Sequence, residues 1–471
     1  MKKTDYMKYK VLVNKEHKIK DNYLSKIELI TTKDVDNLDV QVEKEAYNAY
    51  LKLKKFLQNK KIIIGISSAY RSKKYQQEVY DEFVEKYGKD YADKVVAPVG
   101  CSEHHTGLAI DINIKVNGAW PNGNKELMEQ ENYYKAIHKY FASYGFILRY
   151  PKGKENITGY PYEPWHIRYV GKVVAKIIAK ENYTLEEYLN NYSGVIVVNK
   201  QQGITSFDVV NTISKTLGIK KIGHTGTLDP LATGVLVVTI GKATKIGELL
   251  TATYKEYQAG VLLGVETDTL DITGTIINSK IVPDNLPYEK TLTSFKKTYL
   301  QEVPIYSAVK VNGKKLYDYA RQNKEVVLPK KEVTIKEIEL LGTDRNTFTF
   351  KTTVSKGCYI RSLIRDIGKS LNTYATMTNL IRTKQGKFTL EESSTIEDIK
   401  KGKYHLYKIE DILDYPKIIV DQELEFKIRN GQKLKNIYQV SDKVIFLTEE
   451  KKLLGIYQVE NDVLIVWKNF V

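Results

Sequence analysis

Residues 221–236 read KIGHTGTLDPLATGVL, a stretch dense in glycine and turn-forming residues around a single carboxylate, Asp229. Such a composition predicts a loop, because glycine and Asp-Pro favour turns over regular elements. The apolar segment that follows, residues 235–240, predicts a strand. We therefore expect a loop that presents Asp229 in a close-fitting cleft just before a strand. An ordinary Asp-Pro turn is the alternative interpretation of the same residues.

The chain around this loop reads as strands with one clear helix. Residues 195–198 predict a strand and residues 207–217 a helix, and further strands are predicted at 257–263 and 347–353. The pattern changes at Tyr415-Pro416. Beyond it the segments are short and strand-like, with a turn at Asn430-Gly431, as expected of a small β module of about 55 residues.

The chain before residue 193 has a different pattern. Apolar residues three and four apart predict a helix over residues 42–57, and a second helix is predicted over 76–87, ended by Gly88. Short strands are predicted at 62–66, 109–114 and 165–170, which together favour a mixed α+β domain. A polar stretch from Glu186 to Gly194 interrupts this pattern. We therefore predict an α+β multidomain chain divided into residues 1–192, 193–415 and 416–471.

The composition is that of a globular protein. A length of 471 residues corresponds to about three domains, and 42% hydrophobic with 28% charged residues excludes a disordered or membrane protein. The net charge of +16 is shared by both parts of the chain to a similar degree, so charge alone does not identify a nucleic-acid partner.

The two cysteines and the amino terminus bear on location. Cys101 and Cys358 lie too far apart in sequence to suggest a disulfide framework, which fits a reducing compartment. No apolar run reaches the length of a signal peptide or a transmembrane helix. We expect a soluble, cytoplasmic protein with no membrane partner, and a monomer.

Two strings before residue 193 combine histidines with carboxylates: SEHHTGLAID at 102–111 and EPWH at 163–166. Two histidines and one carboxylate leave one position open on a tetrahedral zinc, as in a catalytic site. Water in that position becomes acidic, and a nearby glutamate such as Glu163 can take its proton and pass it to a leaving amine. Taken singly, each string also fits a hydrogen-bonded histidine or a plain turn.

Residues from about Tyr9 to Asn190 resemble the VanY-like D-alanyl-D-alanine carboxypeptidases and the related L,D-carboxypeptidases. The matching strings are SSAYRS at 67–72, SEHHTGLAID at 102–111, GFILRYP at 145–151 and EPWHIRYVG at 163–171. The resemblance implies that His104, Asp111 and His166 bind Zn²⁺ and that Glu163 is the general base. It also implies that Arg71 binds the substrate carboxylate or stabilises the oxyanion, a role that suits the planar guanidinium.

His104 and His105 are both candidates for the first histidine ligand. Strand alternation would place His105, not His104, on the same face as Asp111. The family has its ligand at the position of His104, and alternation does not apply if His104 lies in a loop before the strand. We therefore assign His104.

Residues 194–471 resemble the TruB-type tRNA pseudouridine synthases, which isomerise one uridine in the T loop of tRNA, the position-55 type. The stretch 221–236 matches the catalytic signature of that family. Further matching strings are NK at 199–200, GITS at 203–206, KEY at 255–257, QEVPIYSAVK at 301–310, GKKLYDYAR at 313–321, SKGCYIRS at 355–362 and LIR at 380–382. Gln201 stands where the family usually has proline. The tail from about Pro416 resembles the PUA-like module that closes many such enzymes.

The resemblance implies that Asp229 is the catalytic carboxylate, attacking either the ribose or the uracil ring. Arg361 would keep Asp229 ionised, and Tyr257 would stack on the base and handle the C5 proton. The target base must be extruded from the folded loop, and His224 would take part by filling the vacated space. RNA and base contacts are assigned to Lys200, His224, Tyr359, Leu380 and Arg382. No cofactor is expected for this reaction.

The two resemblances predict a fusion of a pseudouridine synthase that acts on tRNA with a zinc carboxypeptidase that acts on D-alanine-terminated peptides. The alternatives are a chain that is mainly a peptidoglycan stem-peptide carboxypeptidase, an accidental fusion of two reading frames, and a non-catalytic RNA-binding protein. Whether the peptidase acts on D,D or L,D bonds stays open.

Overall fold

The computed structural model describes residues 9–322 and 324–471, and the chain divides into two compact units. The first unit holds the residues up to Tyr192 together with Ile213–Lys220 and Lys400–Gly402. The second holds the remainder. Among the described residues, no helix is both long and apolar enough to cross a bilayer.

The first unit is built on an antiparallel sheet in the order β3-β4-β6-β5. Its strands are β3 (Ile64–Ser68), β4 (Ala109–Ile114), β5 (Phe146–Leu148) and β6 (His166–Tyr169). A separate pair is formed by β1 (Leu29–Lys33) and β2 (Asp39–Glu43). The helices are α1 (Lys44–Asn59), α2 (Lys73–Tyr87), α3 (Lys89–Val95), α4 (Gly123–Glu129), α5 (Glu131–Tyr144), α6 (Glu155–Thr158), α7 (Lys172–Glu181) and α8 (Leu185–Asn191), with the short 3-10 helices η2 (Leu24–Lys26) and η3 (Glu103–Thr106).

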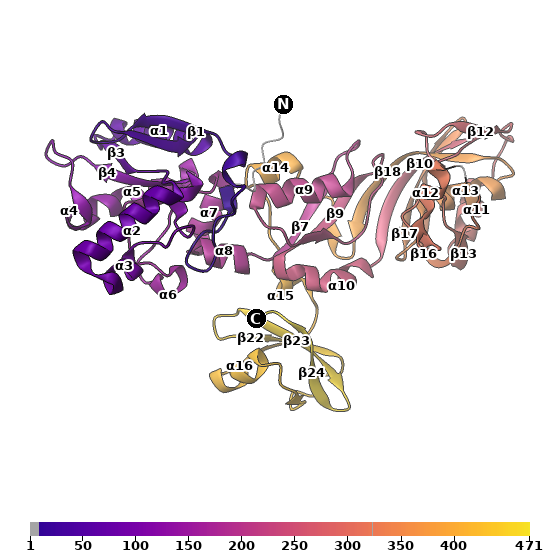
Figure 1. The fold of residues 1–471 in the computed structure, drawn as a ribbon. Helices are drawn as coiled ribbons and strands as arrows, with labels where there is room; N and C mark the ends of the chain where they lie inside the picture. The colour runs from indigo at the N-terminus through magenta and orange to yellow at the C-terminus, as the bar shows by residue number, and fades with distance from the viewer. Residues whose placement is uncertain (1–8, 323) are drawn as a thin grey trace. The chain divides into compact units, whose positions relative to one another are not determined.

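Helices α1 and α5 pack with this sheet in one hydrophobic cluster (Figure 1). The spacing of apolar residues in α1 buries Tyr50, Leu53 and Leu57, which join the sheet residues in one hydrophobic cluster. The carboxylate of Glu43 caps the helix by accepting hydrogen bonds from its first amides. Gly88, at φ 83°, ends α2 as predicted.

The chain after residue 193 forms a nine-stranded sheet in the order β13-β16-β17-β10-β18-β9-β7, with β19 beside β18 and β8 beside β9. Strands β18 and β9 run parallel, and the other pairs are antiparallel. The bounds are β7 (Gly194–Lys200), β8 (Ile222–His224), β9 (Thr233–Ile240), β10 (Lys255–Leu263), β13 (Thr298–Glu302), β16 (Lys330–Asp344), β17 (Thr347–Val354), β18 (Ala375–Gln385) and β19 (Phe388–Thr389).

The chain after residue 193 also contains smaller elements. Two hairpins are formed by β11 (Val265–Thr267) with β12 (Ile276–Ser279) and by β14 (Lys310–Val311) with β15 (Lys314–Lys315). The helices are α9 (Ser206–Leu217), η4 (Gly241–Ile246), α10 (Gly247–Thr251), α11 (Tyr288–Ser294), α12 (Leu316–Arg321), α13 (Ile360–Ser370), α14 (Ile396–Lys400) and α15 (Ile409–Ile412).

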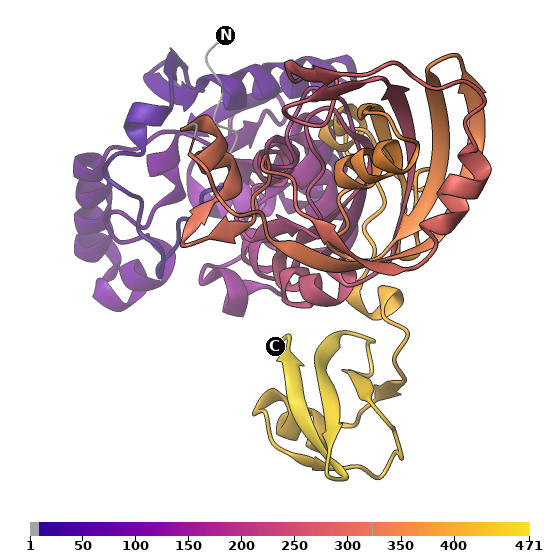
Figure 2. The ribbon, with the colours of Figure 1, turned by 90° about the vertical axis from the view of Figure 1, so that its right-hand side faces the viewer.

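The C-terminal residues, drawn in yellow in Figure 2, form a five-stranded sheet in the order β20-β22-β23-β24-β21. Its elements are β20 (Lys417–Ile419), α16 (Gln422–Arg429), β21 (Leu434–Lys435), β22 (Lys443–Leu447), β23 (Leu453–Glu460) and β24 (Val463–Asn469). The sequence predicted only strand-like segments here. Residues 422–429 are instead a helix capped by Asp421, so the Asn430-Gly431 turn follows a helix and does not join two strands.

Candidate active sites

The sheet of the first unit brings the predicted peptidase residues together. Asp111 on β4 is the cross-strand partner of His166 on β6 and also of Ser68 on β3. Arg71 follows β3 by three residues, and its guanidinium reaches Ser68 Oγ and Asp111 Oδ2, at 2.9 and 3.2 Å from Nη2. The register of two strand pairs therefore sets this cluster.

Asp111 is the centre of the cluster. Its Oδ2 lies 3.2 Å from His104 Nε2, and its Oδ1 lies 2.9 Å from His166 Nδ1. One ligand atom from each of the three residues lies within 4.8 Å of the others. Two imidazole nitrogens and a carboxylate oxygen at this separation are a donor set that fits Zn²⁺ and leaves a position for water.

His104 lies in the 3-10 helix η3, not in a strand, so alternation along a strand does not govern its direction. Its Nδ1 lies 2.6 Å from the backbone oxygen of Ala69, which leaves Nε2 pointing to Asp111. His105 turns away, and its Nδ1 lies 2.7 Å from the backbone oxygen of Arg71.

Burial and charge set the protonation of this cluster. Burial lowers the pKa of His104 to about 4, which keeps the imidazole neutral. Burial opposes the ionisation of Asp111, but the two histidines hold its pKa well below the usual range. The pKa of His166 is lowered by burial but raised more by Asp111 and by Glu103, to about 9.

Glu163 is the neighbouring acid. Its Oε2 lies 3.5 Å from His166 Nδ1, and burial is the main reason that its pKa rises to about 7. The cluster opens into a cavity of about 240 Å³, lined by Arg71, His104, Asp111, Glu163 and His166 together with aromatic residues that include Tyr150, Tyr160 and Trp165.

In the second unit, Asp229 and Arg361 form an ion pair of 2.9 Å between Oδ2 and Nη2. Arg361 is the second residue of α13, and its side chain is 7% exposed, whereas the carboxylate side chain of Asp229 is 39% exposed. Arg361 is fixed by donating to the backbone oxygens of Thr269 and Tyr306, at 2.9 and 3.0 Å. The arginine is thus held by the fold and Asp229 is left accessible.

Tyr257 and Arg382 are paired residues on β10 and β18. Arg382 Nη1 donates to the hydroxyl of Tyr257 at 3.4 Å, and its other nitrogens donate to the backbone oxygens of Val235 and Gly226. These two oxygens belong to residues 221–236, the segment that contains Asp229. Arg382 is therefore a buried residue whose hydrogen bonds connect β18 to the loop that carries Asp229.

The other predicted RNA-contacting residues differ in their burial and in their contacts. Lys200 is fully buried, donates to the backbone oxygens of Gln201 and Pro230, and has its pKa lowered by burial to about 8. Burial and Arg382 lower the pKa of His224, which ends β8. Tyr359 immediately precedes α13. Leu380 on β18 pairs with Ala259 and has no described contact with Asp229.

Two buried carboxylates next to these sites were not singled out from the sequence. Asp271 Oδ2 lies 3.6 Å from Arg361 Nη1, and Glu103 makes ion pairs with two arginines. The acidic run Asp268-Thr269-Leu270-Asp271 between two glycines was a signal for the first. Glu103 stands inside the quoted string 102–111, but nothing in that string distinguishes it from a surface residue.

Comparisons with known proteins match each part of the chain separately. Residues 39–172 match the family of D-alanyl-D-alanine carboxypeptidases named VanY. Residues 214–360 match the N-terminal domain of the TruB family of pseudouridylate synthases, and residues 361–415 match the C-terminal domain of tRNA pseudouridylate synthase B.

Among curated relatives, tRNA pseudouridine synthase B of Caldanaerobacter subterraneus is 44% identical over 259 residues, which cover 54% of this chain and 90% of the relative. The enzyme of the same name from Fusobacterium nucleatum is 43% identical over 57% of this chain and 96% of its own length. Among solved structures, VanYB in complex with D-alanine-D-alanine is 31% identical, with a TM-score of 0.33, over 39% of this chain and 98% of its own.

Proposed function

We propose, starting from the fact that this chain belongs to the TruB family of tRNA pseudouridine synthases, that its second part isomerises a T-loop uridine of the position-55 type in tRNA. We assign this catalysis to residues 193–415 and treat 416–471 as a PUA-like module that assists tRNA binding. The observation that carries the proposal is the accessible carboxylate of Asp229 beside the buried guanidinium of Arg361.

Each residue of the site is assigned a separate chemical role. Asp229 supplies the carboxylate that attacks the ribose or the uracil ring, and Arg361 keeps it ionised and directed. Tyr257 stacks on the base and handles the C5 proton. The reaction needs no cofactor, because the uracil is detached, turned and rejoined by groups that the protein and the nucleotide already contain.

The remaining residues are assigned to the RNA. Lys200, Tyr359, Leu380 and Arg382 are assigned to RNA and base binding, with the buried Lys200 and Arg382 acting through the backbone of the loop that carries Asp229. His224 is assigned to the space that the flipped base leaves. Contacts of basic residues with phosphates supply much of the affinity, so binding weakens as salt increases.

Release of tritium from tRNA labelled at uracil C5 tests the synthase. The wild-type chain should release one equivalent for each tRNA. Asp229→Asn should abolish release while its thermal stability stays close to that of the wild type, because Asp229 is partly exposed. His166→Ala is the control, since that residue belongs to the other site. Full release by Asp229→Asn would contradict the assignment, and tRNA binding without release by the wild type would indicate a non-catalytic RNA-binding protein.

A second function is favoured by the cluster of His104, Asp111 and His166. The part of the chain that matches the VanY family is assigned to residues 1–192 and to removal of the terminal D-alanine from a peptide or peptidoglycan fragment. Bound there, Zn²⁺ would polarise the scissile carbonyl and make a water molecule acidic.

The side chains around the cluster account for the remaining chemistry. Arg71 is assigned to hold the substrate carboxylate or the developing oxyanion, a role that suits the parallel N–H groups of a guanidinium. Glu163, with a pKa raised by burial to about 7, can accept a proton near neutral pH and return it to the leaving amine. Tyr150, Tyr160 and Trp165 line the same cavity of about 240 Å³.

Metal analysis and D-alanine release test this second function. The full chain should bind one zinc and release D-alanine from a D-alanine-terminated pentapeptide or tetrapeptide, and the preferred length distinguishes D,D from L,D cleavage. His166→Ala should lose both zinc and release, with Asp229→Asn as the matched control that retains both. A chain with no zinc and no release would remove the proposal.

The two activities meet in one compartment if both are cytoplasmic, because tRNA is there. We assign the peptidase to trimming of precursor or recycled peptides and the chain to a monomer. Detection of a single 54.1 kDa product in cells would support the fusion. Two shorter products would show that the reading frames are expressed separately.

A further inference from the structure

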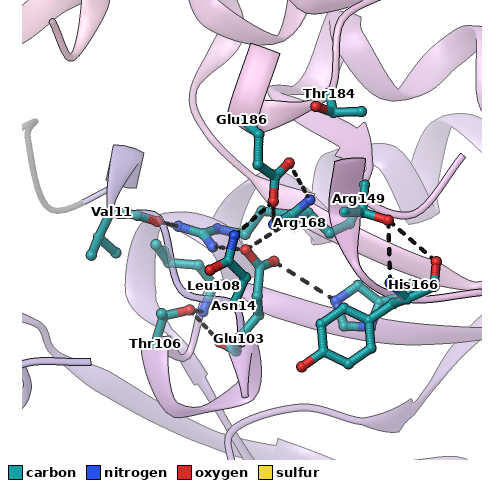
Figure 3. A network of polar contacts seen from close by, with 12 residues as sticks. Val11, Asn14, Glu103, Thr106, Leu108, Arg149, His166, Arg168, Thr184 and Glu186 are labelled. Atoms are coloured by element: carbon teal, nitrogen blue, oxygen red, sulfur yellow. Dashed lines mark hydrogen bonds and ion pairs between the residues drawn. The ribbon is translucent and has the colours of Figure 1, made fainter. Parts of the chain in front are cut away.

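A network of buried charges lies behind the His166 side of the peptidase site (Figure 3). Its core is Glu103 with Arg149 and Arg168, each at most 1% exposed. Glu103 Oε1 accepts from Arg149 Nε at 2.8 Å and from Arg168 Nη1 at 2.7 Å. Arg149 also makes a bidentate ion pair with Glu186, in which Nη1 donates to Oε2 at 2.9 Å and Nη2 donates to Oε1 at 2.6 Å. Two arginines thus hold one oxygen of Glu103, Oε1.

The other oxygen of Glu103 faces His166. Oε2 lies 3.9 Å from His166 Nε2, and Figure 3 shows the carboxylate directed at the ring. Both atoms are buried, and neither has a hydrogen-bond partner within residues 9–322 and 324–471. A distance of 3.9 Å is too long for a hydrogen bond, but buried polar groups without a partner are costly, so the pair gains by approaching.

The second nitrogen of the same ring, Nδ1, lies 2.9 Å from Asp111 Oδ1 and belongs to the metal cluster. A metal-binding imidazole must present a lone pair on one nitrogen, so its proton has to reside on the other. Ligating histidines usually donate that proton to a carboxylate or a carbonyl, which fixes the ring. For His104 the carbonyl of Ala69 has this place, at 2.6 Å from Nδ1.

We propose that Glu103 is the positioning residue of His166: it accepts a hydrogen bond from Nε2–H, which keeps the proton on Nε2 and leaves the lone pair of Nδ1 free to bind the metal between Asp111 and His104. This inference rests on the proposed zinc site. Arg149 and Arg168 fix the carboxylate in the orientation that the ring requires, and Glu103 itself touches neither substrate nor metal.

A different account of Glu103 is that it only neutralises the two buried arginines. Glu186 separates the two accounts, because it is also a carboxylate partner of Arg149 but makes no described contact with His166. Glu103→Gln and Glu186→Gln therefore both remove a charge from one network. In Glu103→Gln the two arginines hold the amide oxygen at the position of Oε1, so an NH2 group that cannot accept faces the ring. If Glu103 has only a structural role, the two variants should change zinc affinity alike. If Glu103 positions His166, only the Glu103 variant should change it.

The test is zinc affinity of the full chain, measured by competition with a chromogenic chelator. Glu103→Gln should weaken zinc binding about 10- to 100-fold, the range found when the outer partner of a metal-binding histidine is lost. Glu186→Gln should lower the melting temperature but leave zinc affinity within about twofold of the wild type, because the supporting partner of the ligand is intact. The visible spectrum of the cobalt-substituted protein should change only for the Glu103 variant.

Glu103→Asp keeps the charge that the arginines need and withdraws the oxygen from His166, so it decides the matter if Glu103→Gln does not fold. It should also bind zinc more weakly. Wild-type zinc affinity and an unchanged cobalt spectrum in a folded Glu103 variant would overturn the inference alone. Absence of zinc binding by the wild type would overturn the zinc site and the inference with it.

Discussion

Asp111 and Asp229 each lie beside an arginine, but they differ in access. The side chain of Asp111 is 12% exposed and is shared by Arg71 and two histidines, whereas that of Asp229 is 39% exposed and has one oxygen on Arg361. A carboxylate surrounded by imidazoles suits a metal, and a carboxylate with a free edge suits direct contact with a substrate. The same residue type is therefore fitted for two kinds of chemistry by its neighbours.

Lys255 offers a test of charge burial at the residue scale. Its Nζ donates to the backbone oxygens of Thr251 and Thr253, and burial is the main cause that lowers its pKa from 10.5 to about 8. Between these values the unfolded chain binds a proton that the folded chain has released, so the free energy of unfolding rises with pH.

We therefore expect the wild type to gain stability relative to Lys255→Met as pH increases from 8 to about 10. Urea unfolding of both proteins at about pH 7.5, 8.5 and 9.5 measures the difference, and the shared titration of other groups cancels. If the difference in free energy of unfolding between the two proteins stays constant with pH, burial does not lower the pKa of Lys255.

At the element scale, local sequence patterns predict where a strand lies. They do not predict which other strand it pairs with. Residues 109–114 form β4 with the predicted bounds, because every residue of that run is buried. The pairing of Asp111 with His166 requires a register between segments far apart in sequence, which no local pattern encodes. The contact of Asp271 with Arg361 was missed for the same reason.

Composition also misled where a local helix signal was short. Residues 422–429 alternate apolar and charged residues for only two turns, which resembles a strand as much as a helix. Likewise, strand alternation favoured His105 over His104, because nothing in the string 102–111 announces a 3-10 turn. The structure directs His104, and not His105, at Asp111, and the metal-binding role of His104 stays a prediction.

Gly234 tests how the register of two elements supports the site. It lies at φ 98° on β9, opposite Arg382 on β18, and an added Cβ would overlap the backbone oxygen of Arg382. Gly234→Ala should destabilise the chain by about 1–3 kcal/mol and displace Arg382 from the loop of Asp229. Pseudouridine formation should fall with it.

Gly223→Ala is the matched control from the same stretch. A Cβ at Gly223 meets only Thr239 Oγ1, at an ordinary 3.6 Å, so this variant should retain stability and activity. Thermal unfolding and tritium release measure both variants. Equal stability and equal tritium release in the two variants would show that the close approach of β9 and β18 is not needed for folding or for activity.

At the scale of the whole molecule, the two sites rest on separate cores. The cluster around α1, α5 and the four-stranded sheet contains residues up to Ile167, and the cluster that includes Val195, Val237 and Ile445 contains none of them. Only Tyr192 and Ser193 lie between α8 and β7. Separate cores imply that loss of one site leaves the other folded.

Metal removal tests this independence. The proposed zinc ligands all belong to the first unit, and the contacts of Asp229 and Arg361 all belong to the second. Dialysis against a chelator should therefore abolish D-alanine release and leave tritium release from tRNA unchanged, and added zinc should restore the peptidase. His166→Ala should reproduce the chelated state without any chelator. A parallel fall of pseudouridine formation in both experiments would show that the two sites are coupled, because the only change common to them is loss of the metal from the first unit.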